Sequence, residues 1–309
     1  MSSPSPRRMR RAVDGILLLD KPLGLSSNKA LQQVRQLFGA AKGGHTGNLD
    51  PLATGLLPLC FGHATKVCGY LLDADKCYEV VCRFGERTST GDREGEVVET
   101  GPADAPRLAG LSDTLSRFVG DIDQIPPMYS ALKHQGERLY RLARKGLEVE
   151  RPARRVRIHS LHLLSQHEEE ATVRVHCSKG TYVRTLVEDL AVALGTVAHV
   201  HSLRRLELGP FTLSQDCYGM DALQAVADQG GATALDPLLL PLDAALQHYP
   251  ALAVNEGLAY YLRQGNPVFI PSSPDAGATV RLYGPADQFL GMGEMLDDGR
   301  CAPRRLMQG

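Results

Sequence analysis

The sequence predicts an α+β fold, with a mixed, largely antiparallel sheet, flanking helices and a small C-terminal β-rich domain. Strand and helix patterns alternate irregularly along residues 14–245, without the regular βαβ repeat of a parallel sheet. A leucine-rich connector punctuated by prolines then crosses residues 236–250. The last stretch, 250–309, has about sixty residues, which is near the lower end of the sizes found for independently folded domains. We therefore expect two folded units.

The first predicted strands and helix lie before and after a loop at residues 44–55. Residues 15–19 are apolar and predict a short buried strand. Ser27 predicts the N-cap of a helix that Gly39 ends, because apolar residues recur between them at helical spacing. Residues 56–61 are again apolar and indicate a buried strand, although a helical turn also fits this length.

The later strands and helices are predicted from the same kinds of pattern. Residues 78–84 and 173–177 alternate between apolar and polar side chains, which predicts strands with one buried face. Gly180 then turns the chain into a helix that Gly195 closes. In the C-terminal unit we expect a short helix and three strands, at residues 258–262, 279–283, 289–295 and 300–306.

Composition bounds the class of protein. The chain has 309 residues, of which 43% are hydrophobic and 22% charged, so it can build a core and is not disordered as a whole. The formal net charge is -1, which by itself does not indicate a nucleic-acid-binding protein. Residues 1–13 are polar and basic and are expected to form a disordered tail.

Positive charge is concentrated in one segment. Residues 133–157 contain nine Lys or Arg against three Glu. Such a run is commonly a solvated face. Because an aromatic residue and small residues lie among the charges, we expect this segment to contact phosphates, through Lys133, Arg138, Tyr140 and Arg144.

Cysteine use and hydropathy exclude other classes. The seven cysteines are odd in number and scattered, and no Cys or His spacing fits zinc, so neither a disulfide framework nor a metal site is predicted. No cofactor is expected. The short apolar stretch near the N-terminus is not a secretory signal, and nothing approaches a membrane span. We expect a cytoplasmic protein, by default a monomer without an obligate protein partner.

The most informative loop reads GHTGNLDPLATG, at residues 44–55. Its single carboxylate, Asp50, precedes a proline, which biases it toward an extended conformation. The surrounding glycines permit tight turns and the hydroxyls can bond the acid. An Asx turn before proline is the alternative explanation.

This loop resembles the GHTG-x-LDPLATG catalytic loop of the bacterial tRNA pseudouridine-55 synthases. Four further segments resemble motifs of that family in the same order: DKPLGLSS (20–27), the segment 78–92, QIPPMYSALKHQGERLYRLARKG (124–146) and CSKGTYVRTL (177–186). Together they span roughly residues 15–210. The resemblance implies a pseudouridine synthase catalytic domain over 14–245 with a tRNA-gripping insertion at about 124–151, and an RNA-binding-like domain over 250–309.

The resemblance implies that the T-loop uridine of tRNA, at position 55, is isomerised to pseudouridine after it is flipped out of the RNA. Asp50 is then the nucleophile or base, and attack on the base, attack on the ribose and abstraction of a ribose proton stay open. Arg184 orients the carboxylate, since its planar fork suits that role. Tyr78 can stack on the base and take part in proton transfer. For each, an ordinary structural role is the alternative.

The remaining candidates surround these three. His45 is expected to stack in the space left by the extruded base, with an ordinary hydrogen-bonding histidine as the alternative. Tyr182 and Leu203 are expected to form walls of the substrate pocket, with ordinary core positions as the alternative. Lys21 either supports the active-site loop, contacts a phosphate or is a buried structural lysine. Asn48 replaces the usual small residue two positions before Asp50, and Ser89 stands where an acid is common.

Three other functions are alternatives to this one. An Asp20-dependent phosphohydrolase needs a second Asp two residues later, where this chain has a proline. A non-catalytic tRNA-binding or RNA-folding protein needs only the basic segment and the C-terminal domain. A synthase that depends on a guide RNA is the third alternative. The insertion at 124–151 favours the stand-alone type.

Overall fold

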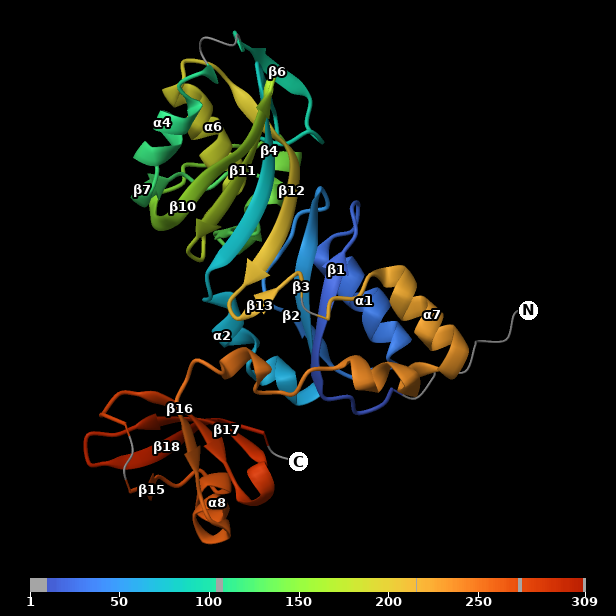
Figure 1. The fold of residues 1–309 in the computed structure, drawn as a ribbon, viewed down its shortest axis with the longest axis vertical. Helices are drawn as coiled ribbons and strands as arrows, with labels where there is room; N and C mark the ends of the chain where they lie inside the picture. The colour runs from blue at the N-terminus through green and yellow to red at the C-terminus, as the bar shows by residue number, and fades with distance from the viewer. Residues whose placement is uncertain (1–9, 104–107, 215, 272–273, 308–309) are drawn as a thin grey trace.

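The computed structural model describes residues 10–103, 108–214, 216–271 and 274–307. The larger part is built on a nine-stranded mixed sheet and the C-terminal part on a five-stranded sheet, as Figure 1 shows. The expected α+β class is confirmed.

The large sheet has the strand order β1-β3-β12-β4-β11-β10-β7, with β2 paired to β3 and β13 to β12. Its pairs are antiparallel except for β3 and β12, which run parallel. The strands are β1 (Gly15–Lys21), β2 (Gly43–His45), β3 (Ala53–Phe61), β4 (Lys76–Phe84), β7 (Gly120–Gln124), β10 (Arg154–His167), β11 (Glu170–Cys177), β12 (Ala198–Leu208) and β13 (Phe211–Thr212).

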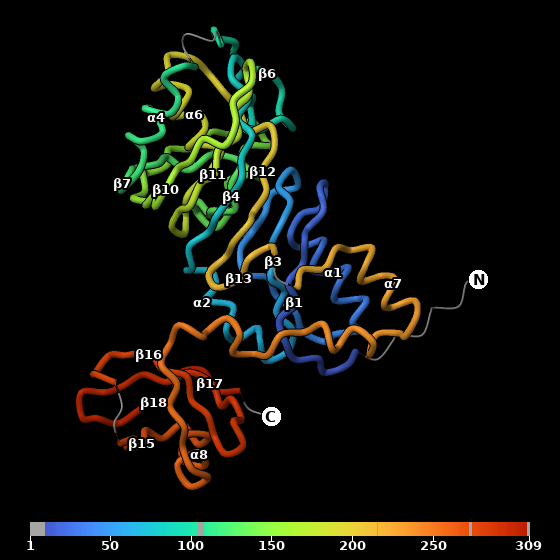
Figure 2. Tube along the Cα trace, viewed as in Figure 1, coloured from blue at the N-terminus to red at the C-terminus, as the bar shows by residue number. Residues whose placement is uncertain are grey.

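Helices flank this sheet at both ends. In Figures 1 and 2, α1 and α7 lie together beside β1, whereas α4 and α6 lie together farther along the sheet, α4 against β10 and α6 against β12 and β4. Two small hairpins complete this part, β5 (Glu86–Thr88) with β6 (Val97–Thr100) and β8 (Lys133–His134) with β9 (Glu137–Arg138). The helices are α1 (Ser27–Leu37), α2 (Cys68–Leu72), α4 (Leu111–Arg117), α5 (Leu139–Arg144), α6 (Val183–Ala193) and α7 (Met220–Gly230).

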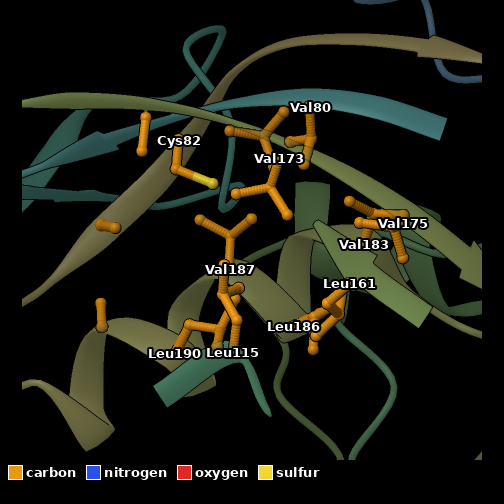
Figure 3. Close-up of a cluster of buried hydrophobic side chains, with 14 of the residues drawn as sticks. Val80, Cys82, Leu115, Leu161, Val173, Val175, Val183, Leu186, Val187 and Leu190 are labelled. Atoms are coloured by element: carbon orange, nitrogen blue, oxygen red, sulfur yellow. The ribbon is translucent and has the colours of Figure 1, made fainter. Parts of the chain in front are cut away.

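The apolar face of α6 forms one of the hydrophobic cores (Figure 3). Leu186 and Val187 are buried against Val80 of β4 and Val173 of β11. Burial of each such side chain stabilises the fold by about 1.5–3 kcal/mol. This packing fixes the first turn of α6, which carries Arg184, relative to the centre of the sheet.

The start of α1 differs from the prediction by one residue. Ser26 is the N-cap, and its side chain accepts a hydrogen bond from the Lys29 amide. Ser27 is already helical and buried, and its hydroxyl bonds both the amide and the carbonyl of Leu49. The prediction for Ser27 was wrong because adjacent serines fit a cap pattern equally well.

The C-terminal sheet has the order β14-β16-β17-β18-β15. Its three longer strands have the predicted bounds, whereas two short strands were not predicted. Lys66 Nζ donates to the Leu306 carbonyl at 2.6 Å and joins the two parts. The elements are β14 (Ala251–Ala253), α8 (Glu256–Arg263), β15 (Val268–Phe269), β16 (Thr279–Tyr283), β17 (Phe289–Met295) and β18 (Arg300–Leu306).

Only the end of the predicted disordered tail, residues 10–13, falls within the described residues. Residues 1–9 lie outside the described residues. The Arg11 amide donates to the Gly39 carbonyl at 2.8 Å, its guanidinium pairs with Asp236, and Val13 is buried. The prediction of disorder is therefore wrong for residues 11–13. In the described ranges, no helix combines the length and apolar character needed to cross a membrane.

Candidate active site

The loop that carries Asp50 is held from several sides. Ser27 bonds the backbone of Leu49, at 2.7 Å to the amide and 3.0 Å to the carbonyl. The Gly24 amide donates to the Pro51 carbonyl at 2.8 Å. The Ala53 amide donates to the Asp50 carbonyl at 3.0 Å and closes the turn. These bonds fix the backbone, while the Asp50 side chain stays 44% exposed.

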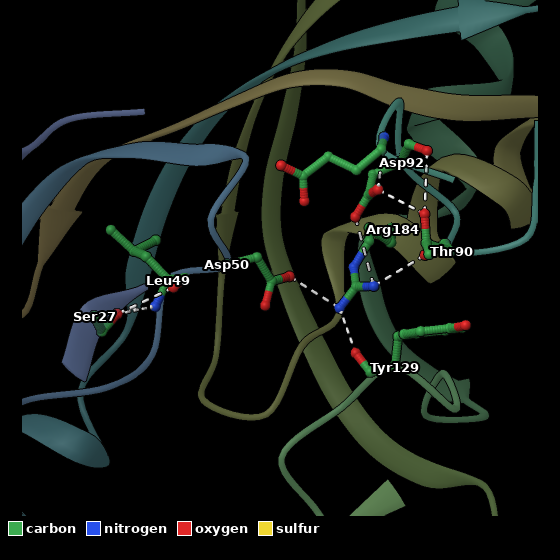
Figure 4. A network of polar contacts seen from close by, with 8 residues as sticks. Ser27, Leu49, Asp50, Thr90, Asp92, Tyr129 and Arg184 are labelled. Atoms are coloured by element: carbon green, nitrogen blue, oxygen red, sulfur yellow. Dashed lines mark hydrogen bonds and ion pairs between the residues drawn. The ribbon is translucent and has the colours of Figure 1, made fainter. Parts of the chain in front are cut away.

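Arg184 reaches Asp50 from the first turn of α6. Its Nη2 lies 2.9 Å from Asp50 Oδ2 and donates to the Tyr129 carbonyl at 2.7 Å, while Nη1 donates to the Thr90 carbonyl at 2.9 Å (Figure 4). The guanidinium is 8% exposed. A charge-assisted bond of this kind is stronger than a neutral one and sets direction as well as distance. The structure therefore brings the two predicted residues into direct contact, with Arg184 placed to orient Asp50.

A second carboxylate lies on the other side of Arg184. Asp92 Oδ2 is 3.7 Å from Arg184 Nη1, and its side chain is 6% exposed. Thr90 Oγ1 donates to Asp92 Oδ1 at 2.6 Å. The buried guanidinium is thus shared between a buried carboxylate and a half-exposed one. Asp92 ends one of the sequence motifs, but no role was predicted for it.

A cavity of about 240 Å³ adjoins the Asp50 loop, which contributes Gly47 and Asn48 to its lining, whereas Asp50 and Arg184 are not among the lining residues. Tyr78 and Tyr182 also line it. Burial raises the pKa of the Tyr78 phenol, which Arg205 opposes, so the hydroxyl keeps its proton at neutral pH. The half-buried Leu203 packs with Tyr78 where two core clusters meet, outside the lining of the cavity.

Lys21 lies under the loop. It is fully buried, and its Nζ donates to the Pro22 and Leu25 carbonyls at 2.9 and 2.6 Å. Burial lowers its pKa to about 8, which the charge of Asp50 partly opposes. An ammonium with no exposed surface does not reach a phosphate in this conformation. Of the three alternatives, contact with a phosphate does not fit this conformation, and the bonds to Pro22 and Leu25 fit a buried structural lysine that holds the segment before α1.

His45, which belongs to the loop, and Arg205, which lies on β12, are close to each other. His45 is half-buried at the end of β2, and burial together with the Arg205 charge lowers its pKa, so the ring is neutral at pH 7. Arg205 is fully buried and lines the cavity, but it was not among the predicted site residues. A signal existed, because residues two apart on a strand share a face and Leu203 was already a candidate.

The basic segment forms the β8–β9 hairpin and α5. Some of its cations have carboxylate partners, such as Lys145 with Glu137 and Arg155 with Asp123. Five exposed cations have none in the described part of the chain; they are Lys133, Arg138, Arg141, Arg144 and, on β10, Arg154. The Arg144 guanidinium lies 5.7 Å from the centre of the Tyr140 ring. These cations are available to phosphates.

A buried cation that orients a half-exposed carboxylate beside a cavity lined by tyrosines is typical of an enzyme. Family models account for most of the chain: the N-terminal domain of TruB family pseudouridylate synthases matches residues 35–183, the tRNA pseudouridylate synthase B C-terminal domain 184–247, and the C-terminal model of pseudouridine synthase II TruB 250–307. The chain belongs to the TruB family and is a pseudouridine synthase.

Curated relatives agree along nearly the full length. The tRNA pseudouridine synthase B of Pseudomonas aeruginosa strain UCBPP-PA14 is 54% identical, over 98% of this chain and 98% of that protein. The protein of the same name from Coxiella burnetii strain Dugway 5J108-111 is 50% identical, over 98% and 97%.

Solved structures share the fold at lower identity. A chain of a Cbf5-Nop10-Gar1 complex has a TM-score of 0.70 at 24% identity, over 91% of this chain and 78% of that one. A chain of an H/ACA RNP bound to a substrate RNA containing 2'-deoxyuridine has a TM-score of 0.72 at 21% identity, over 96% and 85%. At these identities the likeness supports the fold alone.

Proposed function

We propose that this chain isomerises the T-loop uridine of tRNA, at position 55, to pseudouridine, without a guide RNA. The contact of 2.9 Å between Arg184 and Asp50 carries the proposal, because it holds a solvent-facing carboxylate in one direction beside a cavity. The curated relatives, whose names specify tRNA, support the substrate class.

The side chains in and near the cavity then have separate roles in the reaction. Asp50 acts as nucleophile or base and needs no metal or cofactor for either role. Tyr78 presents a protonated phenol, which can stack on the base and donate a hydrogen bond. Tyr182 bounds the flipped base, Leu203 supports Tyr78 from the core behind it, and His45 stacks in the space that the base leaves in the RNA loop.

The RNA is held from outside the cavity. The unpaired cations of the β8–β9 hairpin and α5 contact the tRNA backbone, which gives affinity without reading sequence. Tyr129, which lies just before β8, bonds Arg184 through its carbonyl and so connects this tRNA-contacting segment to the active site. The domain predicted over 250–309, with its five-stranded sheet, adds a second RNA-binding surface. The protein acts as a cytoplasmic monomer without an obligate protein partner.

The experiment is a reaction with one unmodified tRNA transcript and no other RNA. Pseudouridine is mapped by carbodiimide modification and primer extension, with a second transcript that carries cytidine at position 55 as the matched control. Modification at position 55 of the first transcript alone supports the proposal. Modification elsewhere contradicts the assigned site, and tRNA binding without modification supports an RNA-binding or RNA-folding protein instead.

A further inference from the structure

Arg205 is a buried cation without a carboxylate partner among the described residues. Its side chain is 1% exposed, and its Nε donates to the Leu56 carbonyl at 2.7 Å. Its Nη2 has no hydrogen-bond partner within the described ranges. Removing a guanidinium from water is costly unless its donors are satisfied. A purely structural role therefore explains this arginine poorly.

The position of Arg205 connects two parts of the active site. On β12 it pairs across the sheet with Tyr78 of β4 on one side and with Gly55 of β3 on the other. Gly55 ends the Asp50 loop at a φ of 98°, and a Cβ there would lie 2.3 Å from the Arg205 carbonyl oxygen. Only glycine permits this close approach. The backbone of Arg205 thus fits tightly against the end of the loop.

The side chain of Arg205 continues this connection. Both side chains line the same cavity, and the Arg205 charge opposes the rise in the pKa of the Tyr78 phenol. Directly paired residues of neighbouring strands lie on one face of a sheet, so the guanidinium and the phenol face each other across β12 and β4. Because an arginine only donates, a hydrogen bond between them would use the Tyr78 oxygen as acceptor and leave the phenol proton pointing away from Arg205.

We propose that Arg205 is a positioning residue for this reaction: it holds the Tyr78 hydroxyl in one orientation and fixes β4 relative to the Asp50 loop. The proposal deepens the proposed function, on which it rests, because it assigns to Tyr78 an orientation that the reaction uses. Arg205 acts through Tyr78 and does not itself contact the reacting base.

A double-mutant cycle tests whether the two residues act as a unit. Single-turnover rates with saturating enzyme are compared for the wild type, Tyr78→Phe, Arg205→Met and the double variant, with the dissociation constant for tRNA measured for each. We expect each single variant to slow the reaction, the double variant to be no slower than the worse single variant, and tRNA affinity to stay within about threefold. If the two effects on the rate multiply, Arg205 acts independently of Tyr78 and the proposal is wrong.

A second measurement does not depend on the stability of Arg205→Met or on activity. In wild-type protein labelled at arginine nitrogen, the buried Arg205 Nη protons should exchange slowly with solvent. Tyr78→Phe, which removes only the accepting oxygen, should accelerate that exchange at Arg205, while Tyr140→Phe should not. Unchanged exchange in Tyr78→Phe would overturn the proposal even if the enzyme modifies tRNA as proposed. Failure of the proposed function would instead leave this exchange effect intact.

Discussion

Arg184 Nη2 lies 2.9 Å from Asp50 Oδ2, while Nη1 of the same guanidinium lies 3.7 Å from Asp92 Oδ2. The two carboxylates differ in exposure, since the side chain of Asp92 is buried and that of Asp50 is half-exposed. One buried cation therefore connects the folded core to a carboxylate that faces the solvent. This arrangement lets Asp50 meet an RNA base without losing its direction.

Replacement of Arg184 by lysine should slow the reaction without weakening tRNA binding. Lysine keeps the charge but lacks the planar fork that serves Asp50, Thr90 and Tyr129 together. Removal of charge-assisted bonds worth about 1.5–3 kcal/mol predicts a fall of about 10- to 100-fold in the single-turnover rate.

The matched control for that variant is Arg174→Lys. Arg174 lies 3.7 Å from Glu79 in an exposed pair on the sheet, and such pairs contribute little. We expect the control to react at the wild-type rate. A wild-type rate for Arg184→Lys would show that the fork does not position Asp50.

Ser27→Ala should affect the reaction more than Ser26→Ala. Both variants should lower the free energy of unfolding, by about 1–3 kcal/mol for the two buried backbone bonds of Ser27 and about 1 kcal/mol for the Ser26 cap. Only Ser27 holds Leu49, next to Asp50. We therefore expect at least about a tenfold slower single turnover for Ser27→Ala alone. Equal rates would show that the loop holds Asp50 without this hydroxyl.

Lys21 should make stability depend on pH in the alkaline range. Burial lowers its pKa from 10.5 to about 8. Between these values the unfolded chain binds more protons than the folded one, so the free energy of unfolding rises with pH. The rise should be steeper in the wild type than in Lys21→Met, by at most about 1.4 kcal/mol per pH unit.

Urea denaturation at several pH values from about 7 to 10 measures this difference. Lys76, whose pKa is also lowered to about 8 by burial, is present in both proteins and cancels in the comparison. Parallel stability curves would show that Lys21 titrates normally and is not buried as a cation.

The unpaired cations of the basic segment should determine the salt dependence of tRNA binding. Removal of one phosphate-binding cation lowers the slope of log affinity against log salt by roughly 0.7–0.9. We expect Arg138→Gln and Arg144→Gln to weaken binding and to flatten this slope. Arg155→Gln is the matched control, because Arg155 is paired with Asp123. A slope that stays unchanged in the first two variants would place the tRNA elsewhere.

The sequence predicted the parts of the fold that have clear periodicity. Strands such as β16 to β18 were found with their bounds because apolar residues alternate along them. β14 and β15 have three and two residues, which is too short for any period to show. Arg11 is held in place by its pairing with Asp236, which is a contact between residues far apart in the sequence that no local pattern indicates.

For the active site, too, the sequence indicated some residues and not others. Asp50 and Arg184, which the structure places 2.9 Å apart, were candidates because a loop with glycines and prolines has little use for a carboxylate except presentation, and because motifs surround both. Arg205 was missed because a charged residue in a strand is normally placed on the solvent face. Its burial results from the position of β12 between β3 and β4, which is a property of the sheet and not of the neighbouring sequence.

The most direct test of the role of Asp50 is tritium release from a tRNA transcript labelled at C5 of uridine, with the wild type and with Asp50→Asn. The variant keeps the size of the side chain and removes its charge. We expect release from one uridine by the wild type, and release at least about a thousandfold slower by the variant with tRNA still bound. Release by Asp50→Asn at the wild-type rate would contradict the central role of this carboxylate.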